Sequence, residues 1–274
     1  MISILILTLN EEANLPACLD AVRWSDDVVV LDSLSTDRTA EIARERGARV
    51  VQRPFDNWAA HQNWAHANIS FRHPWVFYLD ADERMTPDLQ RELESIAANP
   101  GEARVAFYGG RRNYFMGQWI RHAYPPSSIM RFFRPEKVRF ERLVNPTPVI
   151  DGPHGYLREM FIHHNFSKGM TEWFEKHNRY ATWEAEEGMK LLAGQGPRAS
   201  LFSRDRAMRR KALKNLSFRL PCRPLLKFTY LYLVKGGICD GYPGYVYCRL
   251  QAIYEAMIVV KMIELRRRAR GQAM

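Results

Sequence analysis

The chain lacks the cysteine patterns of disulfide-stapled and zinc-binding proteins. It has four cysteines in 274 residues, and they are Cys18, Cys222, Cys239 and Cys248. None of them lies in a CxxC pair or at a zinc-like spacing. Because a chain of this length buries a sizeable core without covalent crosslinks, we expect reduced thiols in a cytosolic protein and no structural zinc site.

The chain also lacks the pattern of a secretion leader and of a membrane span. No basic segment precedes the apolar residues 1–7, and Glu11 and Glu12 follow them closely, so the start predicts a buried strand rather than a signal peptide. Of two later apolar stretches, 225–234 is too short to cross a bilayer and 245–263 contains too many polar residues. We expect 245–263 to form an amphipathic helix that lies in the plane of a membrane.

Positive charge is scarce in the first half and abundant in the second. The formal net charge is +10, but residues 1–150 are close to neutral and the whole excess lies in residues 151–274. This asymmetry indicates a polyanionic partner for the C-terminal part, either nucleic acid or an anionic membrane. The basic residues of 204–223, interleaved with Leu and Phe and followed by apolar stretches, favour the membrane.

Apolar runs alternate with amphipathic stretches over the first hundred residues, which is the pattern of parallel strands joined by helices. The predicted strands are 2–8, 27–31, 48–51 and 75–79. The predicted helices are 12–22, 35–46, 56–68 and 87–97. Short β-like runs in 103–163 predict that the sheet continues as a mixed sheet, and 170–192 reads as a helix. The expected fold class is α/β with a mixed, mainly parallel central sheet.

The predicted strand at 75–79 ends in two carboxylates, Asp80 and Asp82, one residue apart. Carboxylates at this spacing can share one hard divalent cation, and such a cation neutralises a diphosphate. The alternative is an acidic turn that leads into the next helix, because Thr86, Pro87 and Asp88 are typical helix-start residues.

Polar residues also follow two other predicted strands. Thr8, Asn10 and Glu11 come after the first, where they and the backbone amides could hold a base or ribose, although capping of the next helix explains the same residues. Asp32 ends the second, where it could accept hydrogen bonds from a nucleobase or ribose. No glycine-rich loop follows it, which argues against Rossmann and P-loop sites. In an open α/β sheet these strand ends converge on one ligand site.

Four segments in this order and spacing resemble the GT-A glycosyltransferases of family 2. They are TLNEE (8–12), VLDSLSTDRTAEIARERGARV (30–50), RPFDNWAAHQNWA (53–65) and VFYLDADERMTPDL (76–89). The likeness is greatest to the bacterial lipopolysaccharide-core β-glucosyltransferases and related surface-polysaccharide enzymes. It continues through RRNYFMG (111–117), RFFR (131–134), DGP (151–153), HHNF (163–166), EKHNRY (175–180) and residues 236–255. It therefore covers nearly the whole chain.

The resemblance implies an inverting transfer of a sugar from a nucleotide-diphosphate donor, by family habit a UDP-hexose, to a lipid-linked, lipopolysaccharide or exopolysaccharide acceptor. It implies Mg²⁺ or Mn²⁺ at Asp82, at Asp80 directly or through the ribose, and at His163 as a third ligand or a diphosphate contact. It implies a GT-A catalytic domain over 1–198, with a nucleotide-binding half at 1–100 and an acceptor half at 101–198. Residues 199–274 would then be a basic helical extension on the inner face of the cell membrane.

Further contacts with the nucleotide sugar are implied by the same resemblance. They fall on Thr8, Asn10, Glu11, Asp32, Gln62, Asn63, Asp80 and Ala81. Lys176 and Arg179, spaced three residues apart on a predicted helix, would face the donor diphosphate or an acceptor phosphate; a solvated helix face is the alternative.

The general base that inversion requires is not carried over from the resemblance. Relatives often show His-Glu shortly before the Asp-Gly motif, whereas this chain has Asn145-Pro146-Thr147-Pro148. The nearest carboxylates are Glu141 and Asp151, and we favour Glu141. Glu83 is a third candidate, placed behind these two because we expect it to shape the metal-binding turn.

Two other classes compete with this interpretation. A nucleic-acid-binding protein would account for the sequence pI of about 9.6, but its phosphates would be repelled by the acidic strand ends, so we expect no nucleic-acid partner. A nucleotidyltransferase that makes nucleotide sugars should carry a basic, glycine-rich phosphate loop near the N-terminus, where this chain has TLNEE. The sequence carries no indication of an oligomeric state.

Overall fold

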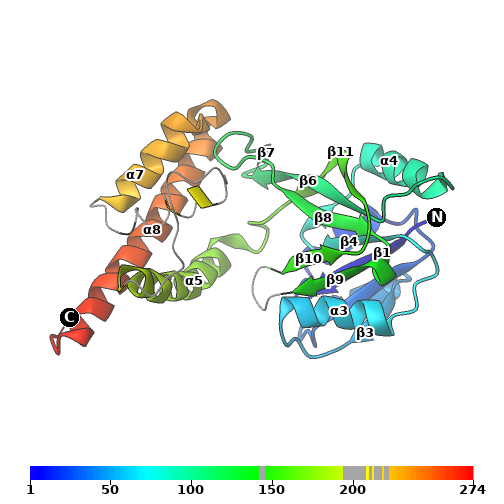
Figure 1. Cartoon of the computed structure of the whole chain (residues 1–274), viewed down its shortest axis with the longest axis horizontal. Helices are drawn as coiled ribbons and strands as arrows, with labels where there is room; N and C mark the ends of the chain where they lie inside the picture. Colours follow the sequence, from blue (N-terminus) through cyan, green and yellow to red (C-terminus); the bar gives the residue numbers. More distant parts are fainter. Residues whose placement is uncertain (142–145, 194–207, 210–211, 213–217, 219–221, 274) are drawn as a thin grey trace. The chain divides into compact units, whose positions relative to one another are not determined.

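The computed structural model describes residues 1–141, 146–193, 208–209, 212, 218 and 222–273 (Figure 1). It divides into two compact units. Unit 1 comprises Met1–Tyr114 and Pro125–Ser167, and unit 2 comprises Phe115–Tyr124 and Lys168–Met274. The structural division therefore falls before the helix predicted at 170–192, whereas the catalytic domain expected from sequence runs on to residue 198.

Unit 1 is built on a mixed sheet in the order β3-β2-β1-β4-β8-β6-β11-β5. Its strands are β1 (Ser3–Thr8), β2 (Val28–Asp32), β3 (Arg49–Gln52), β4 (Val76–Asp80), β5 (Glu83–Arg84), β6 (Ala106–Phe115), β8 (Ser128–Phe133) and β11 (His154–His163). The first four strands in this order are parallel, β8 is antiparallel to both neighbours, and β6 is parallel to β11. The predicted fold class is confirmed.

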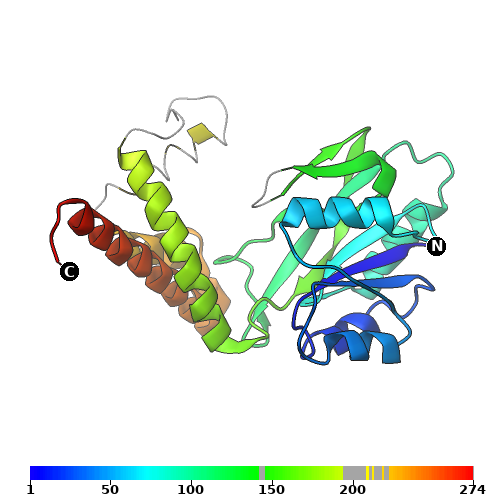
Figure 2. The ribbon, with the colours of Figure 1, turned by 90° about the horizontal axis from the view of Figure 1, so that it is seen from below.

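Helices cover both faces of this sheet, and the side chains of β1 are therefore buried on both sides. Ile4 and Ile6 point to the face covered by α1 (Leu15–Asp20), α2 (Thr39–Glu45) and α4 (Pro87–Ala98). Leu5 and Leu7 point to the opposite face, which α3 (Trp58–Asn68) covers. Figure 2 shows the cyan α3 on one side of the sheet and the blue helices on the other.

A separate hairpin packs beside α3. It consists of β9 (Val138–Glu141) and β10 (Thr147–Ile150), preceded by the short turn of helix η1 (Pro135–Lys137). Val138 and Phe140 join the apolar cluster on the α3 face. The hairpin thus extends unit 1 on the side opposite α1 and α2.

The helix-start residues near the acidic pair do begin a helix. Thr86 caps α4, since its hydroxyl accepts a hydrogen bond from the Leu89 backbone N–H at 3.2 Å, and Pro87 occupies the first turn. Asp80 and Asp82 lie before this cap, on the other side of β5. Helix-start chemistry therefore accounts for residues 86–88 and leaves the acidic pair unexplained.

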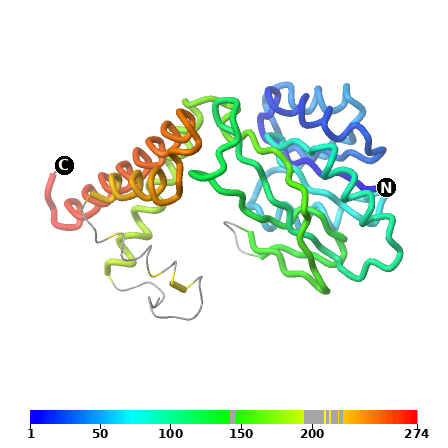
Figure 3. The backbone as a smooth tube through the Cα atoms, turned by 90° about the horizontal axis from the view of Figure 1, so that it is seen from above, coloured from blue at the N-terminus to red at the C-terminus, as the bar shows by residue number. Residues whose placement is uncertain are grey.

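Unit 2 is helical. It contains α5 (Gly169–Leu192), α7 (Arg223–Thr229), η2 (Tyr230–Val234), η3 (Gly237–Asp240) and α8 (Gly241–Ala269). Ala181 and Ala185 of α5 pack against Ile258 and Met262 of α8. In Figures 1 and 3, α7 lies along α8.

The C-terminal part differs from the expected in-plane amphipathic helix. Residues 245–263 form the middle of α8, where Tyr247, Leu250, Ile258 and Met262 are buried inside unit 2. Much of the apolar surface expected to meet lipid is thus used for helix packing. Among the described helices, none is long and apolar enough to cross a membrane. Most of the basic stretch 204–223 lies outside the described residues.

Candidate functional site

Strand register brings the polar strand ends of unit 1 to one edge of the sheet. Thr8 lies opposite Asp32 in the β1–β2 pair, and Leu7 lies opposite Asp80 in the β1–β4 pair. At the far side, His163 of β11 lies opposite Glu83 of β5. Parallel pairing aligns the carboxyl ends of β2, β1 and β4, and the antiparallel pair of β5 and β11 brings His163 beside Glu83.

Asp32 is buried at the centre of a hydrogen-bond network. Its carboxylate accepts hydrogen bonds from Thr8 Oγ1 (3.0 Å), the Ser35 backbone N–H (3.0 Å), the Ser35 hydroxyl and Gln52 Nε2 (3.0 Å). Burial raises the pKa of Asp32, but these hydrogen bonds, that from Gln52 foremost, outweigh burial and lower the pKa below its ordinary value. Since a carboxylate has about four acceptor positions, Asp32 orders the loops here and has little capacity left for a nucleoside.

The loop after β1 is tied to the loop after β2. The Asn10 N–H donates to Ser35 Oγ at 2.8 Å, and Asn10 Oδ1 accepts from the Thr36 N–H at 2.8 Å. The Glu11 N–H donates to Thr39 Oγ1 at 2.7 Å. Asn10 takes a positive φ of 54°, which asparagine tolerates better than most residues. Thr8, Asn10, Glu11 and Asp32 therefore form one assembly, as the sequence predicts.

Asp80 is held by two partners within the unit. The Tyr78 hydroxyl donates to Asp80 Oδ1 at 2.9 Å, and Arg131 Nη2 donates to Asp80 Oδ2 at 2.5 Å. Arg131 comes from β8 and is 5% exposed, while the Asp80 side chain is 35% exposed. Each oxygen of Asp80 thus already has a protein partner.

Arg131 also holds Glu83, the residue that follows Asp82. Arg131 Nη2 lies 2.7 Å from Glu83 Oε1, and Glu83 Oε2 accepts the Asp80 backbone N–H at 3.0 Å. The Glu83 side chain is fully buried, and this burial raises the pKa of Glu83. Arg131 further lies 4.3 Å from the centroid of the Tyr78 ring. One buried cation thus orients two carboxylates of the acidic motif.

The carboxylate of Asp82 lies beside His163. Asp82 Oδ2 lies 3.5 Å from His163 Nε2, and the Asp82 carbonyl accepts the His164 N–H at 2.9 Å. Asn113 Oδ1 lies 2.8 Å from His163 Nδ1, a contact that fixes the ring when Nδ1 carries the proton and leaves Nε2 as an electron-pair donor.

The pair formed by Asp82 and His163 suits a divalent cation that also binds a substrate. Ligands about 2.1 Å from an octahedral ion lie about 3 Å apart, and Mg²⁺ commonly combines one or two protein ligands with substrate phosphates. Among the residues that the structure describes, no three His, Cys, Asp or Glu side chains are grouped to hold a metal. Asp82 and His163 are the closest pair of the expected ligand set, and Asp80, which Tyr78 and Arg131 hold, stays a predicted ligand.

Three organising residues lay outside the sequence-based site list. Arg131 and Asn113 belong to RFFR and RRNYF, which carried the family resemblance but had no assigned role. Arg84 Nη1 donates to the carbonyls of Ala81 (2.7 Å) and Glu83 (2.8 Å), and its Nη2 donates to the Asn14 carbonyl (3.0 Å). Ala81 itself is buried. The order and spacing of motifs in a sequence cannot show which backbone carbonyls an arginine side chain will contact.

Gln62 and Asn63 of α3 face into unit 1. Asn63 Nδ2 donates to the Phe140 carbonyl at 2.8 Å, and Asn63 Oδ1 accepts the Phe140 N–H at 2.7 Å. Its amide is thus committed to fastening β9 to α3, so we leave Asn63 out of the proposed nucleotide contacts. Gln62 is 4% exposed, and its buried Oε1 has no hydrogen-bond partner among the described residues.

The remaining predicted residues are exposed. Glu141 pairs with Arg139 at 2.9 Å, and Asp151 pairs with Lys137 at 3.0 Å. Glu141 directly precedes residues 142–145, which lie outside the described part of the chain. Asn145, the first residue of the Asn-Pro-Thr-Pro segment, is one of them. Lys176 and Arg179 are exposed on α5 of unit 2. Their predicted roles stay predictions.

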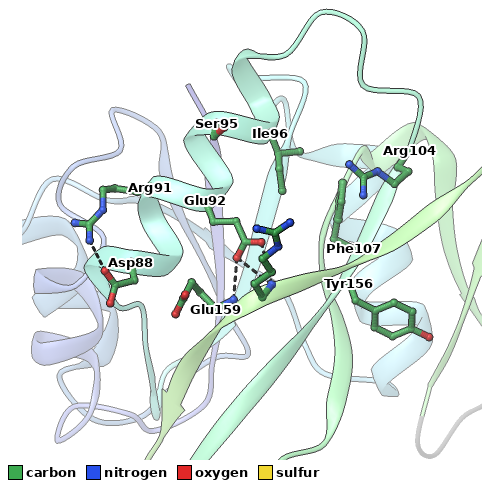
Figure 4. A pocket seen from close by; sticks show the side chains of 10 residues that line it. Asp88, Arg91, Glu92, Ser95, Ile96, Arg104, Phe107, Tyr156 and Glu159 are labelled. Atoms are coloured by element: carbon green, nitrogen blue, oxygen red, sulfur yellow. Dashed lines mark hydrogen bonds and ion pairs between the residues drawn. The ribbon is translucent and has the colours of Figure 1, made fainter.

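A surface hollow of about 490 Å³ lies elsewhere on unit 1, between α4 and the first halves of β6 and β11. Figure 4 shows Glu92 reaching from α4 to β11. Its carboxylate accepts the backbone N–H groups of Arg158 and Glu159, where the β6–β11 register is irregular. Asp88 and Arg91 at the rim pair with each other. These contacts are structural, and those of Glu92 fall at the middle of β11.

Comparison with known proteins places the chain among glycosyltransferases. It is 26% identical over 275 residues to a lipopolysaccharide core biosynthesis glycosyltransferase, LpsC, of Rhizobium meliloti, with 96% of this chain and 92% of the relative covered. It is 24% identical over 282 residues to an uncharacterized glycosyltransferase of Rickettsia typhi, with 98% and 89% covered.

Among solved structures, a glucosyl-3-phosphoglycerate synthase from Mycobacterium tuberculosis, in complex with Mn²⁺, uridine diphosphate and glucosyl-3-phosphoglycerate, aligns with a TM-score of 0.41 and 19% identity. The alignment covers 60% of this chain and 72% of that one. The family model described as glycosyl transferase family 2 matches residues 3–164, which span the sheet and every strand end of the site. The chain is a glycosyltransferase and belongs to glycosyl transferase family 2.

Proposed function

We propose that this protein transfers a hexose, with inversion, from a UDP-sugar to a lipid-linked or lipopolysaccharide glycan. The observation that carries the donor half is the meeting of Asp82 and His163, 3.5 Å apart, at the edge where the loops around Asp32 also end. The relative named for lipopolysaccharide core biosynthesis, which aligns over 96% of this chain, supports the acceptor class. Family membership argues against the nucleotidyltransferase and nucleic-acid-binding alternatives.

The protein groups have separate tasks in this proposal. A divalent cation, Mg²⁺ or Mn²⁺, held by Asp82 and His163 would neutralise the donor diphosphate and make the nucleotide a better leaving group. Thr8, Asn10 and Glu11 bind the nucleoside through a loop that Asp32 holds in shape. Arg131 orients Asp80 beside the metal pair, where Asp80 contacts the ribose.

Activation of the acceptor hydroxyl requires a base within hydrogen-bond reach. Glu141 is the first candidate and Asp151 the second, and both stand at the hairpin formed by β9 and β10. Steady-state transfer rates of Glu141→Gln and Asp151→Asn separate them. Full rates in both variants would remove both residues from the proposal.

Calorimetric titration of UDP with and without Mn²⁺ tests the donor site. In the wild type we expect Mn²⁺ to strengthen UDP binding, and in Asp82→Ala we expect that gain to fall by about tenfold to a hundredfold. Asp88→Ala is the matched control, because Asp88 is an exposed carboxylate on α4 paired with Arg91. Undiminished Mn²⁺-dependent binding in Asp82→Ala would overturn the metal site.

The donor and acceptor are identified by a second experiment. Purified protein is incubated with a panel of nucleotide sugars and lipid-linked acceptors, and products are read by mass spectrometry. We expect transfer from a UDP-hexose that stops in the Asp82→Ala variant. Transfer from a GDP-sugar alone would contradict the UDP assignment and leave the metal pair standing.

A further inference from the structure

The segment from α7 to η3 leaves large apolar side chains exposed on unit 2. These side chains, which we name the α7–η3 surface, are Leu225, Leu226, Tyr230, Leu233, Val234 and Ile238. The most exposed are Val234 at 72%, Leu225 at 63% and Leu233 at 60%. Several exposed leucine, valine and isoleucine side chains in one short segment are typical of an interaction surface.

Helical spacing places most of these side chains on one side. From Leu226, steps of four and three or four residues lead to Tyr230, Leu233 and Val234, while Leu231 is buried. The helix widens to a π turn over η2, where the Lys235 N–H donates to the Tyr230 carbonyl, five residues earlier, at 2.8 Å. Single π turns inside helices are frequent at functional sites.

The exposed charges around this surface have one sign, while the buried Glu255 of α8 pairs with Arg223 at 2.8 Å and lies 3.9 Å from Lys227. Between residues 222 and 249 the acidic residue is Asp240, which is 2% exposed and accepts backbone N–H groups of Arg121, His122 and Ala123. Lys235 and Arg249 are exposed, and Lys227 is partly exposed. The surface therefore presents apolar groups and cations to the solvent without an exposed carboxylate between 222 and 249.

Tyrosines border the same surface. Tyr245 contacts the rings of Tyr232 and Tyr242, with centroids 5.9 Å and 6.4 Å away, and Tyr232 stacks on Phe228 at 5.2 Å. Tyr242 is 68% exposed. Tyrosine rings with an apolar body and a polar hydroxyl are enriched where protein meets the headgroup region of a bilayer.

We propose that the α7–η3 surface docks on an anionic lipid bilayer, with Leu225, Leu233 and Val234 entering the acyl boundary and Lys227 and Lys235 reaching the headgroups. Lysines near apolar side chains extend their ammonium groups to phosphates in this way, and anionic lipid attracts them. A second copy of the chain would oppose cations with cations across a symmetric interface, which disfavours self-association. The surface lies within the extension 199–274 that the resemblance implies for the membrane, but outside the stretch 245–263 expected to lie in its plane. This inference goes beyond the proposed function, because docking on a bilayer does not depend on sugar transfer.

Vesicle sedimentation tests the docking surface. Wild-type protein is mixed with vesicles of equal parts phosphatidylglycerol and phosphatidylcholine, and with vesicles of phosphatidylcholine alone, at low and high salt. We expect the wild type to sediment with the anionic vesicles, and to do so less at high salt. We expect the affinity of Leu233→Glu/Val234→Glu for the anionic vesicles to be at least about tenfold lower. The matched control is Val260→Glu/Ile263→Glu, which alters exposed apolar residues 54% and 44% accessible on α8.

The outcomes are separable. The proposal would be overturned if Leu233→Glu/Val234→Glu bound the vesicles as well as the wild type while circular dichroism showed both proteins folded. It would also be overturned if Val260→Glu/Ile263→Glu lost as much vesicle binding as Leu233→Glu/Val234→Glu. Gel filtration that shows a lipid-independent dimer broken by Leu233→Glu/Val234→Glu would assign the surface to a second copy instead. Mn²⁺-dependent UDP binding is measured in the same variants; we expect it to be unchanged, so that failure of docking and failure of the donor site are told apart.

Discussion

Arg131 is the residue on which the acidic motif depends most. It is 5% exposed and contacts both Asp80 and Glu83, so Arg131→Met would leave two carboxylates beside an apolar side chain without their cation. Breaking a buried ion pair from one side typically costs about 3–5 kcal/mol. We expect urea unfolding to show a loss of that order.

Two further variants test whether the stability loss of Arg131→Met comes from the missing positive charge. Arg91→Met, which removes an exposed arginine paired with Asp88, should change stability little. In Arg131→Met/Glu83→Gln, where one of the stranded carboxylates is neutral, we expect part of the stability to return. A stability loss of Arg131→Met no greater than that of Arg91→Met would contradict the counter-charge role.

Asn63 gives a second test at the level of one side chain. Asn63→Ala removes both hydrogen bonds to Phe140 and leaves a buried backbone donor and acceptor without partners, which costs about 1–3 kcal/mol each in typical cases. Asn68→Ala is the control, because Asn68 is exposed and bonds within α3. We expect lower stability and unchanged UDP affinity for Asn63→Ala; a selective loss of UDP affinity would restore Asn63 to the nucleotide contacts.

Sequence reasoning located the carboxylates but not their partners. Asp80, Asp82 and His163 were predicted together, and folding brought only Asp82 and His163 into one pair. Arg131 lies 48 residues beyond Glu83, and nothing in the local pattern of RFFR shows that its guanidinium enters the core. Which carboxylate a buried cation selects depends on side-chain packing between strands that only the folded sheet places side by side.

At the scale of elements, the first turn of α8 packs so closely against η3 that only glycine fits at position 244. A Cβ on Gly244 would lie 2.3 Å from the Gly237 carbonyl oxygen and 2.5 Å from the Asp240 Cβ. Gly244→Ala should therefore destabilise unit 2 by about 1–3 kcal/mol. Thermal unfolding checks this, with Gly101→Ala as control, where a Cβ would meet only the Asn99 amide oxygen at 3.4 Å. Equal melting temperatures for the two variants would refute the close packing.

Elements in unit 1 followed the local pattern closely. The helix predicted at 87–97 is α4 (Pro87–Ala98), because Thr86 and Pro87 are strong start signals. The helix predicted at 12–22 is shorter, α1 (Leu15–Asp20), since residues 8–12 are drawn into bonds with the loop after β2. The π turn of η2 had no sequence signal, because its extra residue is accommodated by packing rather than by propensity.

At the scale of the whole molecule, acid should unfold the protein through buried carboxylates in both units. Burial raises the pKa values of Asp27, Asp32 and Asp240, but their hydrogen bonds outweigh burial and lower the three pKa values below the ordinary range. A carboxylate whose pKa in the folded state lies below the unfolded value of about 3.9 stabilises the fold above that pH. This stabilisation is lost as the pH falls through the folded-state pKa. We expect the free energy of unfolding to fall steadily below about pH 4.

Asp27→Asn tests this pH dependence. The variant should be less stable near pH 7 and should show a flatter decline below about pH 4, because one linked proton is removed. Asp88→Asn, at an exposed carboxylate, should leave the profile as in the wild type. Denaturant titrations at a series of pH values provide the measurement, and an unchanged slope in Asp27→Asn would show that this carboxylate is not linked to folding.

The residue pattern alone was enough to place the chain in an α/β class, to predict the strand ends on which the proposed ligand site rests, and to indicate the family. These properties rest on periodicity and on motifs read within a few dozen residues, and parallel strands align their ends whatever fills the core. Folding decided which of the paired carboxylates meets His163, which amide fastens a hairpin, and which apolar stretch of unit 2 is buried. Those outcomes depend on contacts between residues distant in the chain, whose geometry is determined only when the elements pack.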